Sequence, residues 1–404
     1  MLIRRFVTLL LAAGVFAVVP AHAQISDGVV KIGVMNDQSG TYADLAGPGS
    51  VVAARMAIED FGAAKKNMKV EVVVADHQNK PDVGSSIARQ WFDADKVDVI
   101  VDVPTSSVVL AVNQVAREKN KALIVSTGAT SDLTGKSCSP NAIHWTYDTW
   151  ALANGTGQAI VKTGGDTWFF LTADYKFGHD LERDTEAVVV KNGGKVVGKV
   201  RHPFPSADFS SFLLQAQSSK AKIIGLANAG ADTTNAIKQG AEFGIVRGGQ
   251  QFAGLLVFLT DVHALGLEKA QGLLLTESFY WDLNDQTRAF STRFAEKHKG
   301  AKPTMAQAGV YSAVLHYLKA VESLKGDDGP KVIARMKELP TDDPIFGKGR
   351  VRPDGRKIHP TYLFEVKKPS ESKGAWDYYK VRATIPADQA FRPIEQGDCP
   401  LVKK

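Results

Sequence analysis

The sequence predicts an α/β protein made of two doubly wound lobes, each with a parallel sheet. Three observations support this fold class: the chain length, an alternation of β-rich and amphipathic segments, and the division of that alternation into two series. The 404 residues exceed the roughly 100 to 200 residues usual for one domain. Alternating strands and helices are typical of βαβ units, which build parallel sheets.

The first series starts at Val29 and predicts one complete lobe. Its helices are amphipathic, as in the first, where Val51, Ala54, Ile58 and Phe61 fall on one face. Strands are expected at 29–35, 70–74, 97–101 and 122–125, and helices near 51–61, 82–92 and 106–118.

The second series follows residues 144–148 and repeats the same pattern, which predicts a second lobe. Strands are expected near 167–171, 195–200, 223–227 and 252–257, and helices near 178–190, 209–218 and 233–243. A strand at 273–276 and a helix at 305–324 are expected to return to the pattern of the first lobe. Glycine and proline residues at 344–353 indicate another crossing or an exposed turn.

The N-terminus has the pattern of a secretory signal peptide. Arg4 and Arg5 precede an apolar run at 6–19, which ends in Pro20 and the small-residue sequence 21–23. The apolar run is shorter than the roughly 18 to 20 residues that a membrane-spanning helix requires. We therefore expect cleavage after Ala23, removal of residues 1–23, and a mature protein in the periplasm.

Charge and cysteine content limit the possible partners. The formal net charge is +6 without a basic block, so neither nucleic acid nor a membrane surface is an expected partner. Cys138 and Cys399 are the two cysteines, and in an oxidising compartment such a pair most often forms a disulfide. We expect this disulfide to tie the C-terminal tail to the body of the protein.

Motifs for catalysis and cofactor binding are incomplete, which favours binding over an enzymatic reaction. Gly155 and Gly157 begin a dinucleotide-type loop, but Ile160 stands where a third glycine is required. The histidines lack the spacing of metal ligands, so we expect neither a metal nor a cofactor. Aspartates near strand ends are more often caps, although a hydrolase with paired aspartates remains an alternative.

Two strand-to-helix junctions in the first lobe carry hydroxyl groups that could hold an anion. They are 104–107 and 126–130. The first begins a helix, whose unpaired N–H groups and partial positive charge can hold a carboxylate. Thr105, Ser106 and Thr130 could donate further hydrogen bonds, and Gly128 would allow close approach of a ligand. Ordinary N-capping is the alternative interpretation.

These junctions resemble those of the branched-chain amino-acid family of ABC-transporter solute-binding proteins, which are type I periplasmic binding proteins. The likeness covers the mature chain. The shared motifs lie at residues 31–34, 39–40, 105–107, 126–130, 133–134, 174–178, 208–210 and 272–275. It implies a two-lobed, monomeric receptor without enzymatic activity that delivers its solute to a membrane permease.

The resemblance also implies where the chain divides. Three crossings near 143–148, 275–281 and 345–352 would join lobe 1 (24–145 with 276–348) to lobe 2 (146–275 with 349–404). The two lobes would close on the ligand by a hinge, and the tail would return to lobe 1 through the predicted disulfide. The family's carboxylate contacts correspond to Thr105, Ser106, Gly128 and Thr130.

The second lobe departs from the amino-acid-binding members at two positions. Ala229, next to Asn228, stands at the place of a tyrosine, and Leu256 at that of the glutamate that pairs with the ligand's ammonium group. An ammonium group buried without a counter-charge would cost several kcal/mol. An α-amino acid is therefore not the expected ligand.

The same substitutions enlarge the pocket and leave aromatic side chains around it. Tyr42, Tyr147, Tyr175, Phe177 and Tyr280 could surround a flat ring. The loop 36–49 resembles that of members that bind benzoate- or coumarate-like compounds. We therefore expect an aromatic carboxylate as ligand. The alternatives are a branched-chain or aliphatic amino acid, with an acid such as Asp148 as ammonium contact, and a sensing role for a signalling partner.

Overall fold

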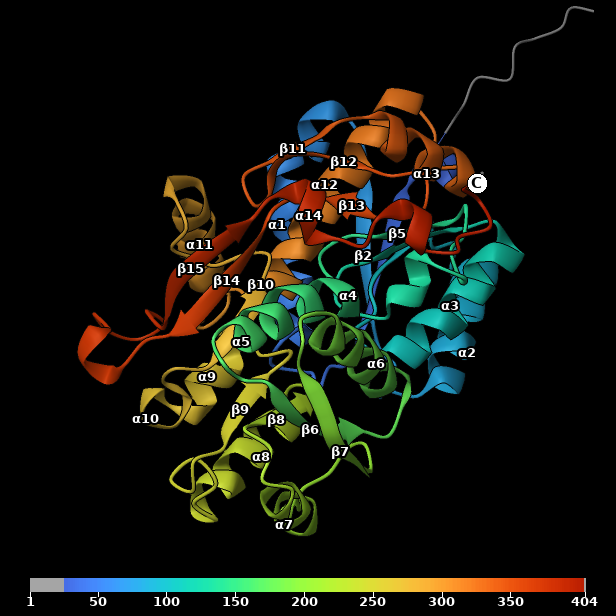
Figure 1. The fold of residues 1–404 in the computed structure, drawn as a ribbon. Helices are drawn as coiled ribbons and strands as arrows, with labels where there is room; N and C mark the ends of the chain where they lie inside the picture. Colours follow the sequence, from blue (N-terminus) through green and yellow to red (C-terminus); the bar gives the residue numbers. More distant parts are fainter. Residues whose placement is uncertain (1–24, 403–404) are drawn as a thin grey trace, which may run out of the picture.

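The first lobe contains a five-stranded parallel sheet in the order β2-β1-β3-β4-β5; Figure 1 shows this lobe, with β2 and β5 labelled. The computed structural model describes residues 25–402, so the predicted signal peptide lies outside the described residues. The strands are β1 (Val30–Asn36), β2 (Val70–Asp76), β3 (Val99–Asp102), β4 (Ala122–Val125) and β5 (Ala142–His144).

Alternating side chains of this sheet enter two separate cores. Val99 and Val101 pack with helices α1 and α12, whereas Ile100 packs with α2 and α3 on the opposite face. A parallel sheet buried on both faces requires such apolar strands. The helices of this lobe are α1 (Gly47–Phe61), α2 (Pro81–Asp93), α3 (Ser106–Lys119), α11 (Asp285–Lys297), α12 (Met305–Leu324) and α13 (Gly329–Glu338).

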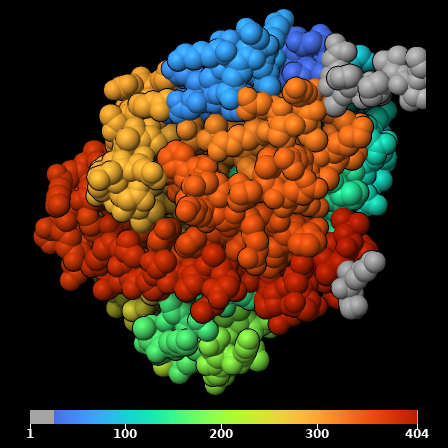
Figure 2. Space-filling view, turned by 90° about the horizontal axis from the view of Figure 1, so that it is seen from above, coloured from blue at the N-terminus to red at the C-terminus, as the bar shows by residue number. Residues whose placement is uncertain are grey.

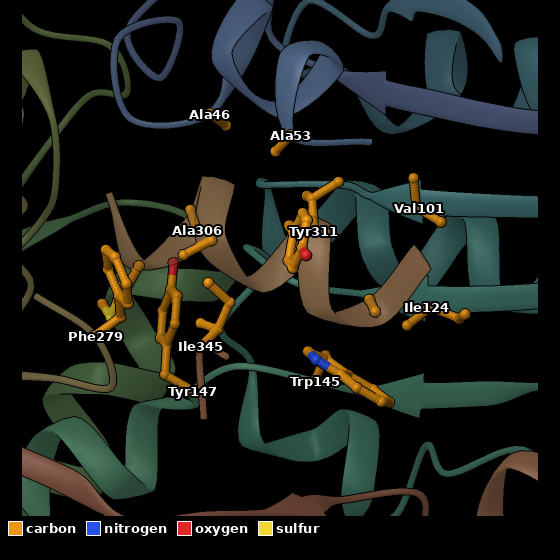
Figure 3. Packing of buried hydrophobic residues seen from close by; sticks show 14 of the residues in the cluster. Ala46, Ala53, Val101, Ile124, Trp145, Tyr147, Phe279, Ala306, Tyr311 and Ile345 are labelled. Atoms are coloured by element: carbon orange, nitrogen blue, oxygen red, sulfur yellow. The ribbon is translucent and has the colours of Figure 1, made fainter. Parts of the chain in front are cut away.

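Helix α12 is the central helix of the first core and has the bounds expected from the sequence. It begins with a capping box, because Thr304 accepts a hydrogen bond from the Gln307 N–H and the Gln307 side chain accepts one from the Thr304 N–H. Figure 3 shows Ala306 and Tyr311 of α12 between the α1 region and Trp145. Trp145 is fully buried and donates a hydrogen bond to the Ser312 hydroxyl of α12 at 2.8 Å.

The second lobe repeats this arrangement with a four-stranded parallel sheet in the order β7-β6-β8-β9. Phe170 faces one core with α6, and Phe169 and Leu171 face another with α7 and α8. The elements are β6 (Thr167–Ala173), α6 (Lys176–Lys191), β7 (Lys195–His202), α7 (Ser210–Ser218), β8 (Ile223–Ala227), α8 (Ala231–Glu242) and β9 (Gln251–Gly254). The predicted fold class of two parallel-sheet lobes is confirmed.

Two expectations for strands were wrong. Strand β9 ends at Gly254, so Leu255 to Val257 continue toward the next helix instead of extending the sheet. The strand expected to return to the first-lobe pattern is β10 (Leu274–Glu277), which pairs antiparallel with β14 (Thr361–Val366). Strand β14 in turn pairs with β15 (Tyr379–Ile385). Pairing with a strand so distant in sequence leaves no local signal.

Smaller elements complete the two lobes and the segments between them. Strand β13 lies beside β5 through a bridge between Arg356 and His144, so the passage toward β14 comes after β13. These elements are α4 (Thr149–Leu152), α5 (Gln158–Lys162), α9 (Leu259–Leu265), α10 (Leu267–Ala270), α14 (Ala387–Ala390), β11 (Thr341–Asp343), β12 (Gly347–Val351) and β13 (Lys357–Ile358). Among the described residues, no helix combines the length and apolar character needed to cross a membrane.

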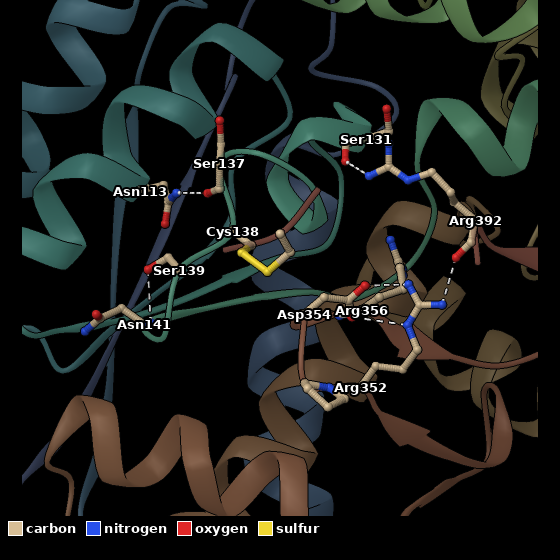
Figure 4. Close-up of a disulfide and its surroundings, with 12 residues drawn as sticks. Asn113, Ser131, Ser137, Cys138, Ser139, Asn141, Arg352, Asp354, Arg356 and Arg392 are labelled. Carbon is tan, nitrogen blue, oxygen red and sulfur yellow. Dashed lines mark hydrogen bonds and ion pairs between the residues drawn. A yellow bond between two sulfur atoms is a disulfide. The ribbon is translucent and has the colours of Figure 1, made fainter. Parts of the chain in front are cut away.

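The C-terminal segment is fastened to the first lobe. Cys138 and Cys399 form the predicted disulfide, and Arg392 donates a hydrogen bond to the Ser131 carbonyl at 2.9 Å. Figure 4 shows both connections. Seen from above, the segment forms a band between helices α11 to α13 and the second lobe (Figure 2). The loop after β4 is therefore held by a covalent link and a hydrogen bond.

Candidate ligand-binding site

A small cavity lies between the carboxyl ends of the two parallel sheets. About 10 Å³ is open to the centre of a water molecule, within about 220 Å³ of space free of atoms. Its lining comes from both lobes: Tyr42, Leu45, Pro104, Thr127, Ala129, Tyr147, Tyr175, Phe177, Ala229, Leu256 and Phe258. Open α/β sheets bind ligands at this edge, because loops from several strands converge there.

Four long helices begin beside this cavity. Helix α1 starts two residues after Leu45 and α3 two after Pro104, α6 starts at Lys176 between Tyr175 and Phe177, and α8 starts two residues after Ala229. Each N-terminus carries unpaired N–H groups and a partial positive charge. The lining itself contains no charged side chain. The site can thus attract an anion through backbone groups, with apolar walls around it.

A tyrosine pair closes the cavity between the lobes. The hydroxyls of Tyr42 and Tyr175 lie 2.5 Å apart. The Phe204 ring stacks on both rings, with its centroid 5.4 Å from that of Tyr42 and 4.3 Å from that of Tyr175. Burial raises the pKa of both tyrosines well above the usual range, so both hydroxyls stay protonated and able to donate. The two lobes therefore meet directly over the site.

A polar network in the first lobe positions Tyr42. Asp37 accepts hydrogen bonds from the N–H groups of Gly40 at 2.6 Å and Tyr42 at 2.8 Å. Asn79 donates to the same carboxylate at 2.6 Å and accepts from the Thr105 hydroxyl. The Thr105 hydroxyl, expected to contact a ligand, thus supports the loop that carries Tyr42.

The other predicted carboxylate donors lie just outside the lining. The Thr130 hydroxyl donates to Asp180 at 2.6 Å. A Cβ at Gly128 would come within 2.2 Å of Val109, so packing requires the glycine whether or not a ligand approaches. The buried hydroxyl of Ser106, and that of Ser126 in the second junction, find no hydrogen-bond partner within residues 25–402. Buried polar groups are rarely left unpaired, and neither of these two hydroxyls belongs to the cavity lining.

Sequence reasoning missed Leu45, Pro104, Thr127, Ala129 and Phe258 in the lining. Pro104 reaches the cavity because Asp102 and Val103 both have positive φ, 83° and 53°. Such backbone is uncommon for a β-branched residue and is found at functional sites. The Thr127 hydroxyl donates to Asp102, whose pKa is raised by burial. The sequence signal for them was that all five lie within three positions of predicted site residues.

In the second lobe, the predicted residues separate into two groups. Phe177, Ala229 and Leu256 line the cavity with Tyr175, and Tyr147 reaches it from the first crossing. Asn228 instead bonds to His202 at 3.1 Å and accepts from Thr233 at 2.6 Å. The hydroxyl of Tyr280 donates to the Trp376 carbonyl at 3.1 Å and accepts the Tyr378 N–H, so its ring belongs to the core beneath β14 and β15.

Two parallel-sheet lobes with a cavity at their facing carboxyl ends define a two-lobed solute-binding protein. The family model described as "Periplasmic binding protein" matches residues 29–375. The chain therefore belongs to this family of solute receptors, with the type I fold.

Solved structures agree with this assignment. A periplasmic binding protein from Burkholderia mallei is 52% identical, with 93% of this chain and 100% of that chain covered and a TM-score of 0.91. A branched-chain amino-acid ABC transporter periplasmic ligand-binding protein from Burkholderia xenovorans LB400 is 42% identical. The match covers 92% of this chain and 99% of that chain, with a TM-score of 0.81.

A more distant structure shares the fold. An ABC-transporter solute-binding protein from R. palustris in complex with benzoate is 22% identical, with 89% of this chain and 97% of that chain covered and a TM-score of 0.80.

Proposed function

We propose that the protein is the periplasmic receptor of an ABC importer and that it binds a carboxylate without an amine, most simply a single-ring aromatic acid. The observation that carries this proposal is the composition of the cavity wall. Helix N-termini converge on it, five aromatic rings line it, and no acidic side chain is among the lining residues. An ammonium group would have no partner there, whereas a carboxylate would have backbone N–H groups.

The buried hydroxyls of Ser106 and Ser126 support a carboxylate at the first lobe. Both lie at the strand-to-helix junctions after β3 and β4 and have free hydrogen-bonding capacity within the described residues. The rings of Tyr147 and Phe258 meet edge to face with centroids 6.1 Å apart, an arrangement that can also enclose a ligand ring. The benzoate named for the R. palustris protein is a compound of the proposed class.

The size of the cavity favours the smallest members of this class. With about 10 Å³ open to water, the closed site is below the roughly 150 Å³ of a cavity known to hold benzene. A ring can enter only if the Tyr42–Tyr175 contact yields. A second candidate is therefore a short aliphatic carboxylic acid, which would demand less expansion.

Titration calorimetry tests these alternatives with one panel: benzoate, 4-hydroxybenzoate, 4-coumarate, butyrate and leucine. We expect binding of a single-ring acid, weaker binding of 4-coumarate because of its longer side chain, and no heat from leucine. Tight binding of butyrate with none of the ring acids would transfer the proposal to the second candidate. Tight binding of leucine alone would refute the proposal.

A further inference from the structure

Two segments meet across the cleft next to the cavity through side chains only. Residues 130–132 follow β4 in the first lobe, and α6 belongs to the second. The Thr130 hydroxyl donates to Asp180 at 2.6 Å, and the Ser131 hydroxyl to Asp184 at 2.8 Å. Lys176 donates to Asp132 at 2.6 Å. All three contacts join one lobe to the other.

Asp132 and Lys176 form the ion pair across the cleft, and each favours the ionised state of the other although Asp132 is buried. Burial acts to raise the pKa of Asp132, but hydrogen bonding to Lys176 and the charge of Arg183 hold it below its ordinary value. Burial acts to lower the pKa of Lys176, and its bonds to Asp132 and Asp180 raise it. The attraction between the lobes is therefore partly ionic and shielded from water.

The cluster can separate without leaving a charge unpaired. On the first lobe, Asp132 also pairs with Lys136 at 3.2 Å. On α6, Lys176 also pairs with Asp180 at 2.6 Å, and Arg183 pairs with Asp180 at 2.8 Å. Breaking a buried pair is costly when a partner is left alone, but each half keeps its own ion pairs. The contact is suited to repeated opening and closing.

The cluster is directly connected to the cavity wall. Tyr175 and Phe177, on either side of Lys176 in the sequence, line the cavity. Ala129, which precedes Thr130, lines it from the first lobe. On the first-lobe side, the loop is held by the Cys138–Cys399 disulfide and the bond from Arg392. Closure of the cluster and closure of the cavity are therefore one movement.

We propose that Thr130, Ser131, Asp132, Lys176, Asp180 and Asp184 form a closure latch, which sets how long a bound ligand is retained and does not contact the ligand. The inference rests on the proposed function only in requiring a ligand that the cleft encloses. Thr130 acts in it as a positioning residue through Asp180.

Stopped-flow fluorescence with 4-hydroxybenzoate tests retention. In Lys176→Met, we expect the dissociation rate to rise about 10-fold with an association rate within about 2-fold of wild type, because interface changes act mostly on dissociation. Added NaCl should raise the wild-type dissociation rate and leave that of the variant nearly unchanged. Lys69→Met is the matched control, because Lys69 forms an exposed pair with Glu71. Equal dissociation rates in wild type and Lys176→Met would overturn the latch.

A double-mutant cycle tests whether Thr130 acts through Asp180. If it does, Thr130→Val combined with Asp180→Asn should dissociate no faster than Asp180→Asn alone, and Thr130→Ser should behave like wild type. Additive effects would place the Thr130 hydroxyl on the ligand and overturn its role in the latch.

Small-angle X-ray scattering of the ligand-free protein gives a reading that does not depend on ligand identity. We expect Lys176→Met to have a larger radius of gyration than wild type at low salt, and the two to converge at high salt. This difference without binding of any panel acid would refute the proposed ligand and support the latch. Equal radii at every salt concentration, with melting temperatures showing that both proteins are folded, would overturn the latch.

Discussion

The two lobes share a backbone plan but present different chemistry to the cleft. The first lobe places polar groups at its strand ends, where Asp37, Asn79 and Thr105 form one network and Ser106 keeps a free hydroxyl. The second lobe presents Phe177, Ala229 and Leu256. The same βα geometry thus places helix N-termini beside the cavity in both lobes, and the two lobes differ in the side chains around them.

The largest expected effect comes from the covalent link that fastens the C-terminal segment to the first lobe. Replacing both cysteines, Cys138→Ser with Cys399→Ser, should lower the free energy of unfolding by about 2 to 5 kcal/mol, because the bond closes a long loop. Thermal unfolding measures the loss. A reducing agent should lower the melting temperature of wild type and leave that of the double variant unchanged. An unaltered melting temperature in the variant would contradict this account of the tail.

The polarity difference between the lobes can be broken at Leu256. Leu256→Glu would place a carboxylate in the apolar wall of the second lobe and should weaken binding of a carboxylate ligand by about 3 kcal/mol, because the buried charge would be uncompensated. Calorimetry with 4-hydroxybenzoate measures this effect, and Leu256→Met, which keeps volume and apolarity, is the control. Undiminished binding by the glutamate variant would show that this wall does not face the ligand.

A buried lysine in β13, beside β5 of the first lobe, lies outside the cavity lining. Lys357 is fully buried with no hydrogen-bond partner for Nζ within the described residues, and Nζ lies 4.3 Å from the Phe346 ring centre. Burial lowers its pKa to about 8. The unfolded chain, with a pKa of about 10.4, binds a proton that the folded protein releases between these values. Stability contributed by this group should therefore rise with pH across that window.

Lys357→Met removes this dependence. We expect wild type to gain about 3 kcal/mol relative to the variant as the pH rises from 8 to 10.4, and the variant to be the more stable protein at pH 7. Denaturant unfolding at several pH values measures the difference. Lys69→Met, at an exposed position, should show no such trend. Parallel curves for wild type and Lys357→Met would mean that the buried ammonium group is stabilised in the fold.

The smallest expected effect sharpens the role of the first lobe. Ser106→Ala should weaken carboxylate binding by about 1.5 kcal/mol, because a hydrogen bond to a charged group is lost. Ser85→Ala removes an exposed hydroxyl that bonds only to the Pro81 carbonyl and should have no effect. Calorimetry with 4-hydroxybenzoate measures the affinity of both variants. Identical affinities would place the ligand's carboxylate away from the N-terminus of α3.

Periodicity predicted the parts of the fold that local sequence controls. Strand β4 and helix α12 have their expected bounds, because apolar periodicity and caps mark both ends. The antiparallel pairing of β10 with β14 depends on a strand distant in sequence. Likewise, the glycine and proline residues at 344–353 indicate a crossing or an exposed turn, yet Arg356 and Lys357 just after this stretch are buried, because Arg356 bridges to His144 of β5.

For single residues of the cavity, too, the sequence predicted position better than side-chain contacts. Tyr175 was expected from its aromatic ring and Ala229 from the family resemblance, and both line the cavity. Thr105 and Thr130 were predicted from hydroxyl groups at strand-to-helix junctions, but their hydroxyls face Asn79 and Asp180. Which way a hydroxyl points depends on partners from other segments, and a strand-end motif does not contain that information.

Native mass spectrometry of the protein purified from the periplasm, followed by exact mass measurement of any released molecule, tests most directly whether the cleft holds a carboxylate that brings no amine. We expect a small carboxylic acid without nitrogen. Release of leucine, isoleucine or valine would contradict the account.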